Sequence, residues 1–315
     1  MADVIKVATR DGYGKALVEL GEKNPDVLVL DADLAAATKT GGFKKAFPDR
    51  FFDTGIAESN MMGVAAGLAT TGYTVFASSF AMFSAGRAFE QVRNTIAYPH
   101  LNVKIGATHA GISVGEDGAS HQCCEDIALM RSIPGMVIIN PADDVEARAA
   151  VFAAAEFDGP VYMRFGRLAV PRIFDESYNF EIGKAVTLKE GSDVTIIATG
   201  LMVSEAIEAA NQLEAEGVSV ELINMHTIKP LDKEAVVKAA KKTGCIVTAE
   251  EHNVIGGLGE AVCEAVCDEY PVPVVKVGVE DTFGKSGPAV DLLHIFGLDA
   301  KNIVEKAKIA ISKKK

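Results

Sequence analysis

The chain has 315 residues, of which 49% are hydrophobic and 23% are charged, and its formal net charge is −12. This composition excludes a disordered or collagen-like chain and is typical of a soluble globular protein. Net acidity argues against non-specific binding to nucleic acid or to a membrane surface, although it leaves room for a local basic pocket. At roughly 150 residues per domain, the length predicts two domains.

No targeting or membrane-spanning segment is evident in the sequence. Residues 1–6 contain an early acid and lack the apolar core of a secretory signal. No apolar run reaches the ~18 residues that a membrane span needs. The five cysteines are odd in number and form no CxxC pair, which argues against a disulfide framework and a zinc site. We therefore expect a cytoplasmic protein.

Short β-branched runs alternate with helical patterns in the first half of the chain. The strand candidates are residues 27–30, 74–77, 103–106, 136–139 and 161–164, with helical stretches such as 12–23 and 142–157 between them. These runs are apolar on both faces, as expected for a parallel sheet that is covered by helices. Their order implies right-handed βαβ units.

The pattern changes near residues 167–189, where Pro171 and several charges replace any long period. A second α/β series then begins. Its strand candidates are residues 194–198, 218–223, 245–248 and 272–277, and an amphipathic helix over 300–312 closes it. We predict an α/β fold of two doubly wound domains, at 1–168 and 191–315, joined by a linker at 169–190.

Glu58 lies between a short aromatic strand that includes Phe51 and Phe52, followed by a turn at Gly55, and a very apolar helix. An acid at this junction is either a helix N-terminal charge, worth a few tenths to about 1 kcal/mol, or a proton carrier in apolar surroundings. Taken alone, Glu58 fits the helix-terminus interpretation better, because such acids are common there.

Two aromatic residues, Phe80 and Phe83, follow the strand candidate at 74–77. At a strand end, both rings could form flat apolar walls for a planar ligand. Ordinary core packing is the more common explanation for an isolated aromatic pair.

The loop at residues 108–122 contains two of the six histidines, two acids and several glycines. It follows a strand, and ligands of open α/β sheets bind at the carboxyl ends of strands. Glycines let a backbone approach a ligand, while His109, Asp117 and His121 could bind hydroxyls. The alternative is a solvated turn, against which the two histidines argue.

The glycines at 256, 257 and 259 superficially resemble a dinucleotide-binding loop. Their spacing is not GxGxxG, and no ribose-binding acid follows. We therefore interpret them as a tight turn between a strand and a helix.

Together these clusters resemble the thiamine-diphosphate-dependent transketolase family. The segments that carry the resemblance are residues 8–10, 31–34, 55–60, 79–83, 108–109, 115–122, 224–232 and 256–259. The resemblance covers essentially the whole chain, but only the C-terminal half of the family's sequence. It implies a pyrimidine-binding domain followed by the transketolase C-terminal domain, as in the C-terminal subunit of a split transketolase.

The resemblance also implies an activity and a partner. The activity is transfer of a two-carbon ketol unit from a ketose phosphate to an aldose phosphate through thiamine diphosphate, as in the pentose phosphate pathway. The family's GDG…N motif, which holds Mg²⁺ and the diphosphate, is absent from this sequence, and residues 115–118 resemble the substrate-side loop instead. An N-terminal transketolase subunit is therefore implied as an obligatory partner, with assembly into a heterotetramer.

The family's cofactor-binding residues match three kinds of position here. Glu58 matches the glutamate that bonds the aminopyrimidine ring nitrogen and supports removal of the thiazolium proton. Apolar surroundings favour the protonated carboxyl that this role needs. Phe80 and Phe83 match residues that pack on the pyrimidine, and Asp33 matches an acid near the cofactor.

The family's substrate-binding residues are matched as well. His109, Asp117 and His121 match residues that contact sugar hydroxyls and the developing alkoxide. Arg10 and Arg164 match arginines that grip the sugar phosphate, because a planar guanidinium fits a phosphate dianion.

Two positions depart from the family pattern. Gly86 stands where some relatives have a third aromatic residue, and Ala37 stands near the place of a phosphate-binding serine. We expect neighbours such as Phe89 or Thr38 to take over these contacts.

Three other interpretations stay open. The chain could belong to another thiamine-diphosphate enzyme, deoxyxylulose-phosphate synthase-like or 2-oxo acid dehydrogenase beta-like. It could be a non-catalytic binding or regulatory module, as the missing diphosphate motif would allow. A nicotinamide-dependent dehydrogenase that uses residues 256–259 is a distant third.

Overall fold

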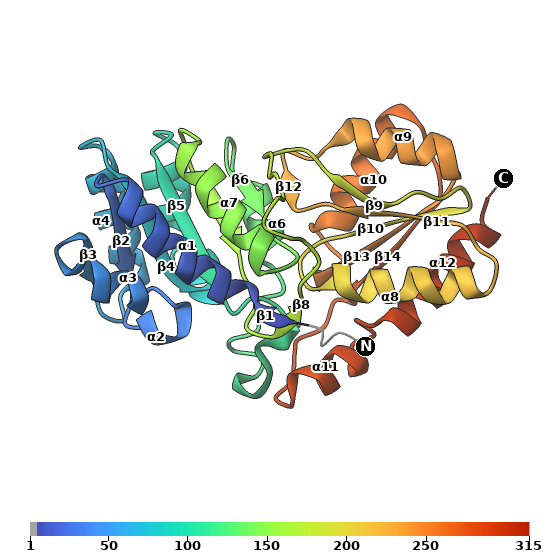
Figure 1. Cartoon of the computed structure of the whole chain (residues 1–315), viewed down its shortest axis with the longest axis horizontal. Helices are drawn as coiled ribbons and strands as arrows, with labels where there is room; N and C mark the ends of the chain where they lie inside the picture. The colour runs from blue at the N-terminus through green and yellow to red at the C-terminus, as the bar shows by residue number, and fades with distance from the viewer. Residues whose placement is uncertain (1–4, 315) are drawn as a thin grey trace.

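The computed structural model describes residues 5–314, and Figure 1 shows two α/β domains side by side along the long axis. Positions 1–4, on which the expectation about a leader depends, lie outside the described residues, as does Lys315. Within residues 5–314, no helix combines the length and the apolar character that crossing a bilayer requires.

The first domain is built on a seven-stranded sheet in the order β12-β6-β7-β5-β4-β2-β3. Its parallel strands are β2 (Val27–Asp31), β3 (Phe51–Asp53), β4 (Thr74–Phe80), β5 (Val103–Thr108), β6 (Val137–Ile139) and β7 (Val161–Arg164). Every residue of β2, β4 and β5 is buried, as a parallel strand covered on both faces should be.

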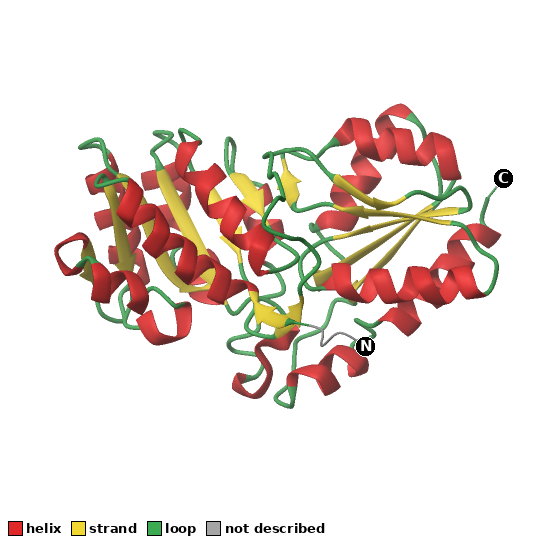
Figure 2. Cartoon of the chain, viewed as in Figure 1, coloured by secondary structure: helices red, strands yellow, loops and turns green. Residues whose placement is uncertain are grey.

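Helices cover both faces of this sheet (Figure 2). On one face, α1 (Thr9–Lys23), α3 (Gly41–Ala46) and α7 (Asp144–Glu156) supply the core residues. On the other face lie α4 (Glu58–Ala69), α6 (Asp126–Arg131) and two π-helical segments, Met82–Arg87 and Val92–Ala97, which flank α5 (Phe89–Gln91). Two shorter elements, α2 (Ala35–Thr38) and the 3₁₀ turn Pro48–Arg50, follow β2 and precede β3.

The second domain contains a five-stranded sheet in the order β14-β13-β10-β11-β9. The strands are β10 (Val194–Ala198), β11 (Val220–Asn224), β13 (Ile246–Asn253), β14 (Val274–Val279) and the antiparallel edge strand β9 (Val186–Lys189). Helices α8 (Met202–Ala215), α11 (Ala289–Ile295) and α12 (Ala300–Ser312) pack on one face, and α9 (Lys233–Thr243) and α10 (Leu258–Glu269) on the other. The predicted α/β fold with two doubly wound domains is confirmed.

Three short strands near the domain boundary were not indicated by periodicity, and one of them, β12, connects the two sheets. Within the expected linker, β8 (Ala169–Pro171) pairs with β1 (Lys6–Ala8), and β9 joins the second sheet. The strand β12 (Thr227–Lys229) follows β11 in sequence but pairs antiparallel with β6 of the first sheet. Its Lys229 Nζ donates to the carbonyls of Arg131 and Ile133, at 2.8 and 2.6 Å. The two domains are therefore joined by backbone pairing.

Candidate active site

The predicted site residues lie after the carboxyl ends of adjacent strands. β2 ends just before Asp33, β4 ends at Phe80, and β5 ends just before His109. These three strands are neighbours in the sheet, so the segments that follow them meet at one edge. Glu58 begins α4, after β3 at the same edge, where an acid also favours the helix terminus.

The two phenylalanines and the two histidines of the loop form one group, which we call the aromatic cluster (Phe80, Phe83, His109 and His121). The rings of Phe80 and Phe83 are nearly parallel, with centroids 6.0 Å apart. His109 stacks on Phe80 at 3.9 Å, and His121 lies edge-on to Phe83 at 5.4 Å. The residues that the sequence suggested as a ring-binding wall and a hydroxyl-binding loop are thus in direct contact.

Glu58 has a cationic partner that the sequence analysis missed. The Glu58 side chain is buried, with 1% of the residue exposed, and its Oε2 accepts a hydrogen bond from Arg87 Nη1 at 3.1 Å. The Arg87 guanidinium also lies 4.9 Å from the Phe83 ring centroid. The surroundings of Glu58, expected to be mostly apolar, therefore also include a cation, since a buried carboxyl group needs a polar partner. The spacing of Arg87 four residues after Phe83 was the available signal.

His109 is held in a defined protonation state. Burial, together with the positive charges of Arg10 and Arg167, lowers its pKa to about 3, so the ring is neutral near pH 7. Arg10 Nη1 lies 2.8 Å from Nε2, and because arginine only donates, Nε2 is the acceptor. Nδ1 then carries the proton and donates to Thr108 Oγ1 at 2.9 Å.

The loop continues from His109 into a tight 3₁₀ turn, Ile112–Asp117. Asp117 is exposed and lies 3.9 Å from Arg167, which also pairs with Glu116 at 3.2 Å. His121 Nδ1 lies 2.9 Å from Ser120 Oγ. Asp117 thus stands at the rim of the loop, whereas His121 belongs to the aromatic cluster.

The loop glycines serve packing between the domains. Gly111 and Gly118 have φ values of +80° and +75°, which favour glycine. A Cβ on Gly111 would collide with the Glu251 side chain, and one on Gly118 with Ser286. Both partners belong to the second domain. The interpretation that these glycines let a backbone approach a ligand is corrected for these two positions.

Arg164 lies outside the aromatic cluster. Its side chain is only 3% exposed, and its Nε donates to Asp126 Oδ2 at 2.8 Å. Nη2 donates to the carbonyls of Cys123 and Glu251, at 3.3 and 2.8 Å. The guanidinium is thus committed to a buried ion pair and to backbone carbonyls, and the predicted role in gripping a sugar phosphate is corrected.

Thr38 and Phe89, expected to replace the missing family residues, make contacts within the protein instead. Thr38 is buried and donates to Asp31 Oδ2 at 2.7 Å. Phe89 packs against the hydrophobic core. The space beside Gly86 contains Met82 Cε, 2.5 Å from where a Cβ would lie.

Asp33 lies just after the carboxyl end of β2 and is exposed. Its backbone N–H donates to Asp53 Oδ1 at 3.1 Å, and its φ is +62°.

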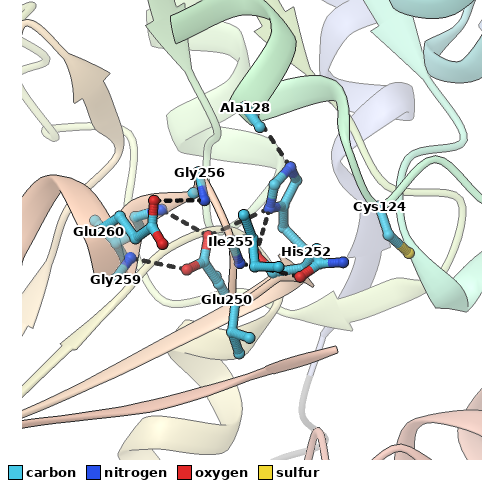
Figure 3. A network of polar contacts seen from close by, with 12 residues as sticks. Cys124, Ala128, Glu250, His252, Ile255, Gly256, Gly259 and Glu260 are labelled. Carbon is cyan, nitrogen blue, oxygen red and sulfur yellow. Dashed lines mark hydrogen bonds and ion pairs between the residues drawn. The ribbon is translucent and has the colours of Figure 1, made fainter. Parts of the chain in front are cut away.

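The turn before α10 binds a carboxylate of its own domain, as Figure 3 shows. Glu250 accepts hydrogen bonds from the backbone N–H groups of Leu258 and Gly259, at 2.6 and 2.8 Å. A Cβ on Gly257 would collide with this carboxylate. The helix N-terminus that a dinucleotide phosphate would need is therefore already occupied by Glu250, in agreement with the interpretation as a tight turn.

Comparison with known proteins identifies both domains. The family profile described as "Transketolase, pyrimidine binding domain" matches residues 5–172, and "Transketolase, C-terminal domain" matches residues 183–303. The "Putative transketolase C-terminal section" of Methanocaldococcus jannaschii is 52% identical over 300 residues, which cover 94% of each chain.

Two further relatives are described as subunits or split chains. The "6-deoxy-6-sulfo-D-fructose transketolase subunit SqwH" of Clostridium sp. (strain MSTE9) is 46% identical over 298 residues, covering 95% of this chain and 92% of that protein. A solved structure described as "Split gene transketolase, inactive beta4 tetramer" is 56% identical, with a TM-score of 0.93, and the match covers 98% of this chain and 100% of that one.

Proposed function

The chain belongs to the transketolase family, and on this premise we propose that it is the C-terminal subunit of a two-chain transketolase. The proposed reaction transfers a two-carbon ketol unit from a ketose phosphate to an aldose phosphate. The observation that carries the proposal is the position of Glu58, buried at the strand edge and linked through Arg87 to the aromatic cluster.

The residues at this edge fit the pyrimidine end of thiamine diphosphate. When bound, this cofactor supplies the stabilised carbanion that ketol transfer requires. Phe80 and Phe83 offer nearly parallel apolar rings, and Glu58 offers a carboxyl group beside them. Arg87 contacts Oε2 of Glu58, which leaves Oε1 for a hydrogen bond to a ring nitrogen. We assign to Glu58 the sharing of a proton with that nitrogen.

We assign binding of the sugar substrate to Arg10, His109 and His121. Arg10 Nε is buried and has no hydrogen-bond partner among the described residues. A buried donor of this kind normally has a partner, and a substrate oxygen would supply it. His109 is neutral and His121 lies against Phe83, and we assign to both rings the contacts with sugar hydroxyls. Asp117 and Asp33, at the exposed rim, would make outer contacts.

We propose that Mg²⁺ and the diphosphate are held mainly by an N-terminal-half partner chain. In support, one relative is named a subunit, and the split-gene relative is described as inactive when it consists of beta chains. Exposed apolar residues beside the site fit a partner surface, since Ile56 is 77% exposed two residues before Glu58, and Val64 of α4 is 38% exposed. A heterotetramer of two chains of each kind is the proposed assembly.

A second candidate function differs in the donor sugar. The Clostridium relative is named for a sulfonated ketose. Some relatives have a phosphate-binding serine near the position of Ala37. In this chain the neighbouring Thr38 hydroxyl is not available to bind phosphate, because it is buried and bonds Asp31. A sulfonated donor would need a different set of anion-binding residues from a phosphorylated donor.

One reconstitution experiment tests both candidates. The chain is mixed with candidate N-terminal subunits, and Mg²⁺-dependent binding of thiamine diphosphate is measured by calorimetry. Ketol transfer is then assayed with a ketose phosphate and with 6-deoxy-6-sulfofructose as donors. We expect binding and transfer to appear only in the mixture. Absence of both with every candidate subunit would defeat the proposal, and the preferred donor decides between the two functions.

A further inference from the structure

The histidine loop (residues 108–122) is fixed by contacts that come from the second domain. Glu251 Oε1 accepts a hydrogen bond from the backbone N–H of Ser113 at 2.5 Å. Gln122 Nε2, at the other end of the loop, donates to the carbonyl of Lys285 at 2.9 Å. Between these points, α11 packs against the 3₁₀ turn of the loop. The loop that contains His109 and His121 is thus clamped from outside its own domain.

Among the described residues, Glu251 provides the only carboxyl group in these contacts. It lies near the end of β13, is 3% exposed, and reaches across the domain boundary to the loop backbone. Gly111 is adjacent to the carboxylate and could not accept a Cβ without displacing it. The Glu251 backbone carbonyl also accepts from Arg164, which ties the same residue to the end of β7. Both its side chain and its backbone therefore fix neighbouring parts of the first domain.

Glu250 provides a natural contrast. Successive residues of a strand point to opposite faces, so Glu250 turns toward α10 in its own domain, as Figure 3 shows. Both glutamates are buried, and burial raises the pKa of each to about 7. The two adjacent side chains are similarly buried, but that of Glu251 bonds the histidine loop, whereas that of Glu250 bonds the turn before α10.

We propose that Glu251 is a positioning residue for the site, holding the histidine loop so that His109 and His121 face the bound sugar. This inference rests on the proposed function and gives the second domain a direct part in it. His109 precedes Ser113 by four residues and adopts a left-handed conformation, with φ of +55°. A hydrogen bond that fixes the backbone at Ser113 therefore limits where the His109 ring can lie. A misplacement of about 1 Å can cost on the order of a hundredfold in rate.

The test compares Glu251→Met and Glu251→Gln with the control Glu250→Met. Methionine keeps the length of the side chain and removes the acceptor, whereas glutamine keeps an acceptor oxygen. Hydrogen–deuterium exchange of the isolated chain is read first. We expect Glu251→Met to speed exchange at residues 111–118 by about ten- to a hundredfold, because the buried N–H of Ser113 is left without an acceptor. Glu251→Gln should remain near wild type, and Glu250→Met should speed exchange in α10 instead.

The kinetic readout uses the assembled complex. Glu251→Met should lower kcat/KM for the ketose donor by about a hundredfold, with thiamine diphosphate affinity unchanged, and Glu251→Gln should restore it. Equal loop exchange and equal kcat/KM for Glu251→Met and Glu250→Met would overturn the proposal. If Glu251→Met does not fold, Gly111→Ala serves as the second variant, because its methyl group displaces the carboxylate. The exchange measurement does not depend on catalysis. An inactive wild-type complex would therefore refute the proposed function, while the exchange rates would still show whether Glu251 fixes the loop.

Discussion

Removing the guanidinium of Arg164 should destabilise the chain strongly. In Arg164→Met, the Asp126 carboxylate, which is fully buried, loses its cation and retains the Tyr162 hydroxyl at 2.9 Å. Breaking a buried ion pair by removing one partner costs about 3–5 kcal/mol. The carbonyls of Cys123 and Glu251 lose their donor as well. We therefore expect the free energy of unfolding to fall by about 3–5 kcal/mol.

The double variant Arg164→Met with Asp126→Leu separates the ion pair from general packing damage. Replacing both partners with apolar side chains leaves no uncompensated charge, so the double variant should be more stable than Arg164→Met by about 2 kcal/mol. Urea unfolding of the isolated chain, followed by circular dichroism, gives the free energies.

Two outcomes would refute this reasoning. One is an Arg164→Met variant within about 1 kcal/mol of wild type, which is the range of an exposed pair. The other is a double variant whose loss equals the sum of the two single losses. A stable Arg164→Met variant that raised the KM for a phosphorylated donor would instead support the phosphate role indicated by the resemblance.

Two further predictions concern a glycine and a buried histidine. Gly257→Ala should lower the free energy of unfolding by about 1–3 kcal/mol, because the added methyl group meets the Glu250 carboxyl group. The control Gly63→Ala, on α4 with open space beside it, should be neutral or stabilising. Equal urea midpoints for the two variants would contradict this prediction. Burial lowers the pKa of His226 to about 4. Between pH 6.5 and pH 4, the unfolded chain therefore binds a proton that the native chain does not. The free energy of unfolding should fall by about 3 kcal/mol as the pH falls through this range. His226→Gln should remove this part of the pH dependence in urea unfolding, and an unchanged slope would show that His226 does not cause it.

The sequence was sufficient for the strands and for the convergence of the aromatic cluster. The predicted strands are mainly apolar runs, as burial on both faces of a parallel sheet requires. Residues that follow the carboxyl ends of adjacent strands meet at one edge whatever their separation in sequence. Phe80 and His109, which lie 29 positions apart, are in contact for this reason, with ring centroids 3.9 Å apart.

The sequence was insufficient where a side chain depends on a distant partner. Arg164 matches a substrate arginine by position, yet Asp126, 38 residues earlier, binds it. The glycines of the histidine loop indicated an unusual backbone but could not show that Glu251 and Ser286 fill the space beside them. The strand β12 has only three residues, too few for a period, and its partner strand belongs to the other domain.

The most direct test of the central claim is the turnover of the reconstituted complex with Glu58→Gln. Glutamine keeps the size of the side chain but cannot exchange a proton as a carboxyl group does. We expect the variant to assemble with the N-terminal subunit as wild type does, while ketol transfer falls by about 10²–10⁴-fold, the usual contribution of a positioned acid–base group. Wild-type turnover in a correctly assembled Glu58→Gln complex would contradict the account.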